Sequence, residues 1–408
     1  MRRFFPVRSC AFGSLRSQRP KCFSAVAGNA GQVLQAKVRC GLSGEITVDL
    51  HNPAKILTPD PLMIYLPPYS IASSKQPAEL PKFIRGQPTV VINYRWAGFV
   101  RSSARDFPRW EKAQPNQDRN LRWPTPIHDT TIAYNWILEN LTAGDQPREI
   151  YVCGSYLGAT LAASLALTET YPEERMSIRG CVAYNGIYNW TSFFPGHPLN
   201  FRSHPGPEDE EWKTDSSFDE LGRQAKKLFG IPGDLFDPFA SPYYFFHRPK
   251  FAVPKSFTGE LAELEERPQQ KRGSTKLASW KQVNFPPPEA EQESSRRSRL
   301  RIPEMLLMHS APPPSERLIR EYWPGDRGNC FMTQAEDLGM SVKRGAYHNE
   351  NKEHASSLFD GDTERDEWME GLHKRVSIRD VGGHGKNLSL SPKAEFLARD
   401  WIQDRMPA

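Results

Sequence analysis

Short runs of consecutive apolar residues recur along the chain and predict strands that are covered on both faces. The clearest runs are at residues 62–66, 89–92, 150–153, 181–184 and 305–308, with a shorter one at 376–378. Near the start, apolar residues alternate with polar ones on both sides of Ser43-Gly44. This alternation predicts a β-hairpin.

Segments with a helical period lie between these strands. Residues 126–141 place apolar side chains at three- and four-residue intervals, and residues 157–167 are rich in alanine and leucine. Two further helices are expected at 363–374 and 392–403. Because strands that alternate with helices form a mostly parallel sheet, the sequence predicts an α/β fold with helices on both faces of that sheet.

Two polar segments interrupt this rhythm, at residues 249–300 and 311–358. The first is so poor in large apolar residues that it cannot offset the entropy of ordering, and we expect most of it to be disordered. Residues 235–247 are dense in aromatic side chains and are expected to form a cap element inside a cap region at 195–300. We therefore expect a single domain at 32–408, with a polar insertion at 311–358.

The first 44 residues contain no aspartate or glutamate, but they carry eight lysine or arginine residues among serines and scattered large apolar residues. This composition is typical of a mitochondrial transit peptide, and a disordered basic tail is the alternative. We expect residues 1–31 to be a transit peptide or disordered segment and the mature protein to reside in the mitochondrial matrix.

Charge and composition exclude several classes of protein. The 53 lysine and arginine residues are interleaved with 48 aspartate and glutamate residues, so nucleic-acid binding is not expected. The six cysteines have no C-x-x-C pair, which favours a reduced compartment over a disulfide scaffold. Residues 150–168 lack charge, but they change from a strand-like to a helix-like texture, so no membrane span is expected.

No metal or cofactor is expected either. His348 and His354 have carboxylates around them, but without a cysteine or a second histidine pair they are interpreted as solvated loop residues. Neither a phosphate-binding G-x-x-x-x-G-K-[ST] loop nor a strand-linked G-x-G-x-x-G is present, so nucleotide binding has no support.

The sequence CGSYLGA at 153–159 separates a predicted strand from a predicted helix. A nucleophile elbow has the pattern G-x-Nu-x-G, in which the glycines let strand and helix approach while the central residue sits at the apex. The register that uses Gly154 and Gly158 places Tyr156 at the apex. Ser155 is the alternative nucleophile, but it comes one residue early and could serve only if the turn slipped.

The chain resembles the α/β-hydrolase superfamily, specifically its hormone-sensitive-lipase-like group of carboxylesterases. The resemblance runs through residues 61–66, 90–96, 124–141, 149–167, 237–244 and 301–402. It implies an α/β-hydrolase fold and an ester-hydrolysing site. The nucleophile position falls on Tyr156, the histidine on His384 within Gly-Gly-His-Gly, and the acid on Asp362. Asp362 is equally well interpreted as a loop carboxylate or a helix N-cap.

The resemblance also shows where this chain departs from an esterase. A phenol has a pKa near 10 and would project its oxygen beyond the position of a serine hydroxyl at the apex. The family's oxyanion loop falls on Pro67-Pro68-Tyr69. That loop acts through backbone N–H groups, and proline has none. The backbone N–H of Leu157, after the nucleophile position, would be the remaining donor.

These observations favour an α/β-hydrolase-fold protein with a degenerate esterase site, a pseudo-hydrolase with a ligand-binding or structural role in mitochondria. A pocket lined by Tyr69, Tyr156 and the aromatics of 236–247 would hold a small apolar or acyl ligand. The inserts would dock on a larger mitochondrial assembly. The alternative is an active hydrolase of ester, thioester or amide bonds that uses His384 and Asp362 with a non-standard nucleophile or an activated water.

Overall fold

A computed structural model describes much of the chain. The described residues are 23–27, 32–41, 44–68, 78–96, 121–142, 147–171, 173–194, 197, 199, 216–246, 250–254, 280–284, 302–311, 328–354, 370–371, 374–383 and 388–406.

A nine-stranded sheet runs through the centre of the molecule, in the order β1-β2-β3-β5-β4-β6-β7-β10-β11. Its strands are β1 (Phe23–Ala27), β2 (Gln32–Arg39), β3 (Glu45–His51), β4 (Leu62–Leu66), β5 (Thr89–Asn93), β6 (Arg148–Ser155), β7 (Met176–Tyr184), β10 (Glu304–His309) and β11 (Val376–Asp380). All pairs from β5 to β11 are parallel, whereas β1, β2 and β3 form an antiparallel meander that joins β5. The predicted hairpin and the six predicted strands are confirmed.

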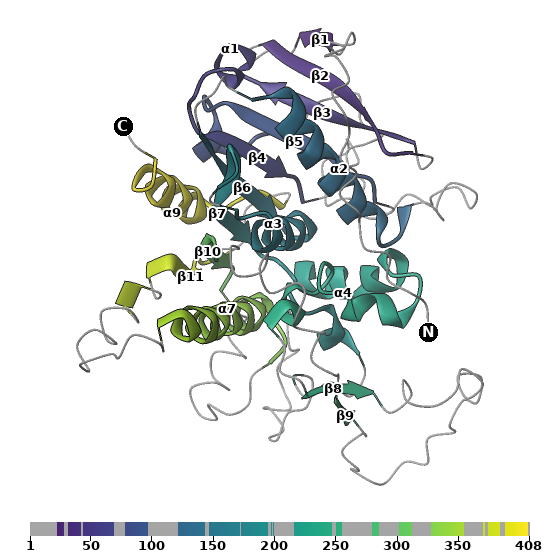
Figure 1. Cartoon of the computed structure of the whole chain (residues 1–408). Helices are drawn as coiled ribbons and strands as arrows, with labels where there is room; N and C mark the ends of the chain where they lie inside the picture. Colours follow the sequence, from purple (N-terminus) through teal and green to yellow (C-terminus); the bar gives the residue numbers. More distant parts are fainter. Residues whose placement is uncertain are drawn as a thin grey trace.

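Helices cover both faces of this sheet (Figure 1). The helices of the described residues are α1 (Pro53–Ile56), α2 (Thr125–Asn140), α3 (Leu157–Thr168), α4 (Ser216–Leu228), α7 (Phe331–His354) and α9 (Pro392–Gln403), of which α4 belongs to the cap. Successive residues of a strand point to opposite faces. On β6, Gly154 lies against α3, whereas the ring of Tyr151 packs edge-on against Trp401 of α9 at 6.4 Å. Helices α3 and α9 therefore lie on opposite faces.

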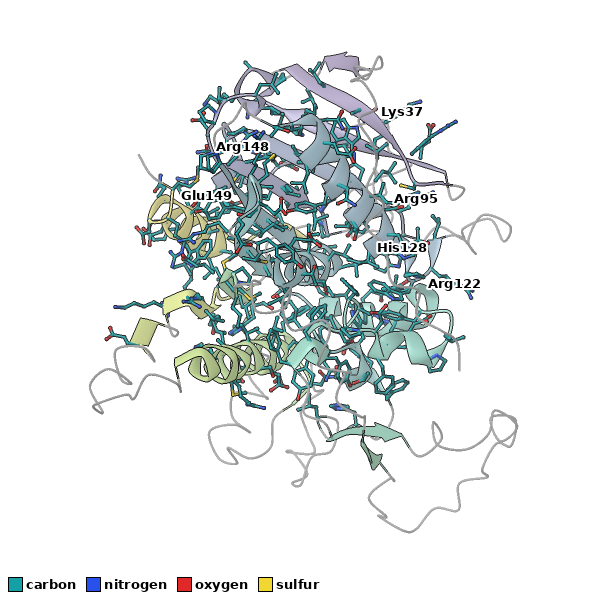
Figure 2. The ribbon with its side chains drawn as sticks, viewed as in Figure 1. Lys37, Arg95, Arg122, His128, Arg148 and Glu149 are labelled. Atoms are coloured by element: carbon teal, nitrogen blue, oxygen red, sulfur yellow. The ribbon has the colours of Figure 1, made fainter. Side chains whose placement is uncertain are left out.

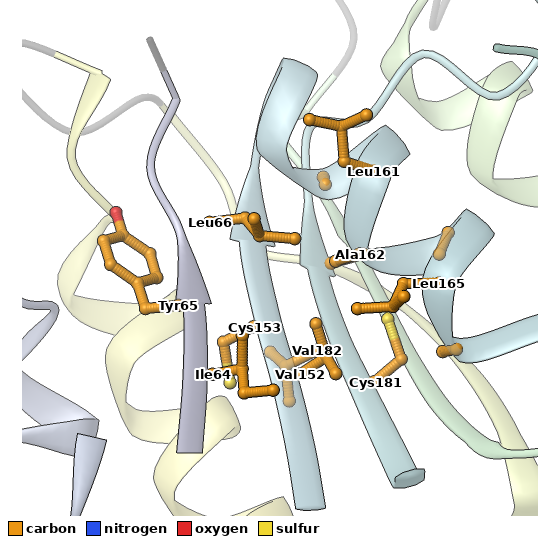
Figure 3. Close-up of a cluster of buried hydrophobic side chains, with 14 of the residues drawn as sticks. Ile64, Tyr65, Leu66, Val152, Cys153, Leu161, Ala162, Leu165, Cys181 and Val182 are labelled. Atoms are coloured by element: carbon orange, nitrogen blue, oxygen red, sulfur yellow. The ribbon is translucent and has the colours of Figure 1, made fainter. Parts of the chain in front are cut away.

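Strand and helix pack through large apolar side chains because β4, β5 and most of β6 are buried on both faces. Figure 3 shows this layer, in which Ala162 and Leu165 of α3 lie beside Cys181 of β7. The strand order, the crossover helices and the tight β6–α3 turn together make up an α/β-hydrolase fold. The predicted helices at 126–141, 157–167 and 392–403 are confirmed as α2, α3 and α9.

The structure changes the expectation for residues 311–358. Residues 331–354 form α7, which packs against β10, β11 and the 3-10 helix η7 (Pro242–Phe246). Its buried side chains recur at helical spacing within a polar sequence, namely Phe331, Ala335, Leu338, Val342 and Ala346. The polar composition hid this apolar stripe, so the expectation of a polar insertion does not hold over 331–346.

Two segments that were expected to be a transit peptide or disordered contain strands in the structure. Within 1–31, residues Phe23–Ala27 form β1 and pair with β2 at the edge of the sheet. Within 249–300, β8 (Lys250–Pro254) pairs with β9 (Trp280–Asn284) in a separate antiparallel sheet. The rest of both segments, and most of the helix expected at 363–374, lie outside the described residues.

The cap region contains α4 and three 3-10 helices, η4 (Trp190–Phe193), η6 (Pro232–Phe236) and η7. Ser241 joins two of these pieces, because its hydroxyl donates to Leu235 O at 2.7 Å and accepts from Trp190 N at 2.9 Å. Ser164 of α3 donates to Phe239 O at 2.8 Å. The aromatic segment at 235–247 is thus fastened to the core.

Candidate functional site

The turn between β6 and α3 has Tyr156 at its apex, with φ 54° and ψ −117°. A bulky residue with positive φ is uncommon and stores backbone strain, which persists only where the surrounding structure imposes it. Here the N–H of Tyr156 donates to Tyr184 O at 2.8 Å, and its carbonyl accepts from the first turn of α3. Hydrogen bonds on both sides hold the strained conformation.

The two glycines of the turn are required because a side chain at either position would clash with the backbone. A Cβ on Gly154 would lie 2.2 Å from Gly158 O, and one on Gly158 would lie 2.2 Å from Leu66 O. Both distances are far shorter than a van der Waals contact, so no side chain fits at either position. The β6–α3 packing therefore fixes the register of the turn with Tyr156 at its apex.

Tyr156 is fully buried, and aromatic rings enclose its side chain. Its ring lies edge-on to Tyr184 of β7 at 5.8 Å and to Phe331 of α7 at 5.7 Å. Phe331 in turn lies edge-on to Phe218 of α4 at 5.0 Å. Edge-to-face pairs at these distances are stabilising. The apex side chain is therefore part of a packed aromatic cluster.

The phenol oxygen of Tyr156 has a polar neighbour. Asn185 Nδ2 approaches it at 3.5 Å, at the outer limit of a hydrogen bond. Asn185 itself has φ 51°, and its Oδ1 accepts from the backbone N–H of Ser310 at 2.8 Å. The amide thus connects the apex to the segment that follows β10.

Ser155 is the last residue of β6 and is 1 % exposed. By the alternation of side chains along a strand, it shares a face with Cys153 and Tyr151, whose ring contacts α9. Its hydroxyl therefore projects away from α3, on the face opposite the helix that the turn begins.

The residues at the oxyanion position lie next to the turn. Pro67 and Pro68 directly follow β4 and are buried. The Pro67 carbonyl accepts a hydrogen bond from Tyr94 Oη at 2.6 Å and approaches Gly158 so closely that a Cβ there would lie 2.6 Å from it. Since proline has no N–H, Pro67 presents a carbonyl to the turn and no donor. Leu157, the first residue of α3, is fully buried beside it.

Three of the expected site residues, Tyr69, Asp362 and His384, lie outside the described residues. The described segments that lead toward them are held by backbone hydrogen bonds. Val381 N donates to His309 O at 3.0 Å, and Ala311 N donates to Gly382 O at 2.8 Å. These bonds keep the ends of β10 and β11 together.

Strand β10 ends at His309, a buried residue whose Nδ1 lies 3.0 Å from Ser310 O. From the sequence, this position was noted only because it lacks the carboxylate expected after residues 305–308. The two cysteines near the turn offer no substitute nucleophile. Burial raises the pKa of Cys153 well above its usual range and that of Cys181 to about 12, so both are protonated and unreactive at neutral pH.

Sequence reasoning missed the side chains that close the space over the turn, Phe331 and Phe218, because they lie far along the chain from Tyr156. It also missed Gln334 of α7, which is 1 % exposed. Gln334 Oε1 accepts from the backbone N–H groups of Tyr188 and Asn189, at 3.0 and 2.8 Å. The apolar spacing of α7 was the signal that could have found this helix.

A hollow of about 800 Å³ lies on the other face of the sheet, beneath α9 and near the amino ends of β6 and β10. Its lining is mostly charged, and includes Glu149, Arg179, Glu304, Arg379, Asp400, Asp404 and Arg405. Arg179 lies 3.9 Å from Glu149 and 3.7 Å from Glu304, and Arg405 also pairs with Glu304. Figure 2 shows Glu149 beside Arg148, across the view from Arg122 and His128. Ligand pockets are predominantly apolar, so this charged hollow does not suit an acyl ligand.

Among the residues that the structure describes, no helix is long and apolar enough to cross a membrane. The same residues hold no group of three or more histidine, cysteine or acidic side chains arranged to bind a metal ion.

No model of a known protein family matches the sequence, and no curated protein matches it. Solved structures with a similar chain include carboxyl esterase 2 from the fungus Tuber melanosporum, at 14 % identity over 95 % of this chain and 89 % of that one, with a TM-score of 0.44. An esterase from Rhizomucor miehei matches at 12 % identity over 94 % of this chain and 81 % of its own, with a TM-score of 0.39.

An esterase from Pyrobaculum calidifontis matches at 18 % identity over 52 % of this chain, with a TM-score of 0.34. The match spans 61 % of that archaeal chain, less than two thirds of its length. These proteins are esterases, and this chain is similar to them in fold. The α/β-hydrolase fold assigned here follows from the chain's own strand order and connections.

Proposed function

We propose that this protein is a pseudo-hydrolase, an α/β-hydrolase-fold protein of esterase-like ancestry whose elbow packs the core instead of performing catalysis. The observation that carries the proposal is Tyr156, which occupies the apex of the elbow, is fully buried and lies between the rings of Tyr184 and Phe331. A nucleophile must be reachable by the substrate carbonyl, and a side chain enclosed by aromatic rings is not.

The oxyanion position supports the same proposal. Pro67 offers no N–H, and its carbonyl is turned toward the elbow and bonded to Tyr94. Removing one oxyanion donor from a working hydrolase lowers the rate by about 10²–10³. Restoring a serine at the apex alone would therefore not restore an esterase.

The setting that we propose is mitochondrial, and the role is that of a binding or structural subunit. The acid-free, arginine-rich first 44 residues support the location. A fold that has lost its chemistry can persist as a scaffold, because function resides in the site and not in the fold.

The test is hydrolysis of p-nitrophenyl acetate and butyrate, together with labelling by a fluorophosphonate, by the full chain. We expect wild type, Tyr156→Ser and Ser155→Ala all to show neither turnover above buffer nor covalent label. Wild-type turnover that disappears in His384→Ala would contradict the proposal and establish an active hydrolase. Sedimentation of the protein in mitochondrial extract tests the assembly role, because a free monomer at physiological salt would remove it.

A further inference from the structure

The first turn of α7 covers the elbow. Phe331, the first residue of the helix, is 2 % exposed and contacts both Tyr156 and Phe218 through its ring. Tyr156 lies at the β6–α3 turn of the core, and Phe218 lies on α4 of the cap. Phe331 therefore fills the space between the core and the cap. We call the first turn of α7, residues 331–334, the seal.

One side chain in this turn fastens the seal to the core. Besides accepting from the N–H groups of Tyr188 and Asn189, Gln334 donates from Nε2 to Ser192 Oγ at 2.9 Å and to Asn329 Oδ1 at 3.1 Å. Both acceptor sites and both donor protons of the amide are therefore used, which is the full capacity of a glutamine. A buried amide loses its hydrogen bonds if it moves, so Gln334 stabilises one position of this helical turn.

The partners of Gln334 also bear on the elbow. Tyr188 and Asn189 belong to the segment that leaves β7 immediately after Tyr184 and Asn185, the two β7-side neighbours of Tyr156. Gln334 therefore joins the seal to the segment that holds the other side of the Tyr156 ring.

We propose that the seal closes a latent apolar site over the elbow, that Gln334 is the latch of this seal, and that the unsealed site binds a small planar aromatic molecule. The ligand class follows from the walls, because Tyr156 and Phe218 present their rings to the volume that the Phe331 ring fills. An apolar cavity opened by removing such a ring stays dry and takes a ligand of similar shape. Phe331 acts in the native protein as an internal occupant.

Releasing the seal removes the Phe331 ring from the ring of Tyr156 and opens that side of the phenol to solvent. The positive φ of Tyr156 is held by backbone hydrogen bonds with Tyr184 and the first turn of α3, so the turn itself does not depend on the seal.

The proposal rests on the proposed function, since it gives the closed elbow a ligand class, but a different measurement tests it. Ester hydrolysis tests the loss of catalysis, whereas tyrosine nitration and indole binding test the seal. If the protein hydrolyses esters and Tyr156 is nitrated faster in Gln334→Leu than in wild type, the proposed loss of catalysis is contradicted and the proposed seal is supported.

Nitration by tetranitromethane measures access to Tyr156. In wild type we expect Tyr156 to stay unmodified, and in Gln334→Leu we expect its nitration to become roughly tenfold faster because the opened population rises. Gln224→Leu is the matched control, since Gln224 is also buried, at 3 % exposed, but lies on α4. Tyr134 of α2, 1 % exposed, is the internal reference and should not change.

Indole binding measures the site itself. Phe331→Ala should gain about 2 °C or more in Tm at saturating indole, whereas wild type and Phe396→Ala should gain nothing. Phe396 is the matched control because it is a phenylalanine of α9 that is 66 % exposed. Unchanged nitration in Gln334→Leu, or no Tm gain in folded Phe331→Ala, overturns the proposal.

Hydrogen exchange in wild type keeps the test valid if a variant fails to fold. The amides of Tyr188 and Asn189 should exchange through a local opening that leaves Val152 of β6 protected. Exchange of all three amides only by global unfolding would mean that the seal does not open, and would overturn the proposal.

Discussion

The two edges of the parallel sheet differ in how their space is used. At the carboxyl edge, where β6 meets α3, Tyr156 is fully buried between the rings of Tyr184 and Phe331. Toward the amino edge, beneath α9, a hollow of about 800 Å³ is left among charged side chains. Sites on open α/β sheets normally lie at the carboxyl ends of the strands. The comparison shows that a turn can keep the backbone geometry of an elbow while its apex side chain packs into the core.

The amino edge depends on one buried cation. Arg148, the first residue of β6, is 2 % exposed and donates to the carbonyls of Asp60, Ile56 and Leu141. Burial lowers its pKa to about 10. The segment 56–60 and the C-terminal end of α2 thus meet at one guanidinium.

Replacing this cation should give the largest effect on stability. Arg148→Met leaves three carbonyls without their donor, two of them on the buried residues Ile56 and Leu141, and we expect it to lower the free energy of unfolding by about 3–5 kcal/mol. Urea denaturation followed by circular dichroism measures this loss. Arg179→Met is the control, because that side chain is 52 % exposed and its ion pairs at the rim of the hollow should contribute less than about 1 kcal/mol. Equal losses in the two variants would contradict the assignment.

The carboxyl edge should respond to the size of the apex side chain. Tyr156→Ser removes a fully buried ring, and we expect a loss of about 3–5 kcal/mol, since the cavity adds to the lost burial. Tyr156→Phe keeps the ring and removes the phenol oxygen, including its long contact with Asn185, so we expect a much smaller loss, of about 1 kcal/mol. Thermal unfolding of both variants checks the order. A Tyr156→Ser protein as stable as wild type would show that the cluster does not contribute to the core.

A smaller effect is expected from pH, at the far end of α3. Burial and the neighbouring Glu174 raise the pKa of Glu169 from 4.5 to about 7. The folded state therefore keeps this proton at a pH where the unfolded chain has lost it, and stability falls as the pH rises from about 4.5 to about 7. Because the side chain is partly exposed, we expect a change of about 1–2 kcal/mol.

Glu169→Gln checks that assignment. The variant should lose this part of the pH dependence and be more stable than wild type at pH 8, as measured by urea denaturation at pH 5 and pH 8. The raised pKa of Glu169 would be contradicted if the free energy of unfolding of wild type rose from pH 5 to pH 8. It would also be contradicted if Glu169→Gln showed the same pH dependence as wild type.

The sheet and the register of the elbow could be predicted from sequence because both depend on local signals. Runs such as residues 62–66 mark doubly covered strands, and the spacing of Gly154 and Gly158 places Tyr156 at the apex. Helix α9 was predicted with its observed limits, 392–403. Ser391 caps it, accepting from Ala394 N.

The closure of the elbow could not be predicted in this way. Phe331 reaches Tyr156, and Phe218 reaches Phe331, only because α4 and α7 fold back over the turn, and neither helix was expected. Gln334 carries no local sign of its role, since a glutamine among polar residues normally faces solvent. Such contacts depend on tertiary packing between segments far apart in the sequence.

The fit of the two elbow glycines bears on how such proteins are recognised. Gly154 and Gly158 leave no room for a methyl group whatever residue stands between them, because the obstacle is backbone. Packing of the strand against the helix therefore requires both glycines whether or not the turn supports a reaction. A motif search that weights the glycines more than the central residue would count this chain among the esterases, so the identity and exposure of residue 156 are the better diagnostic.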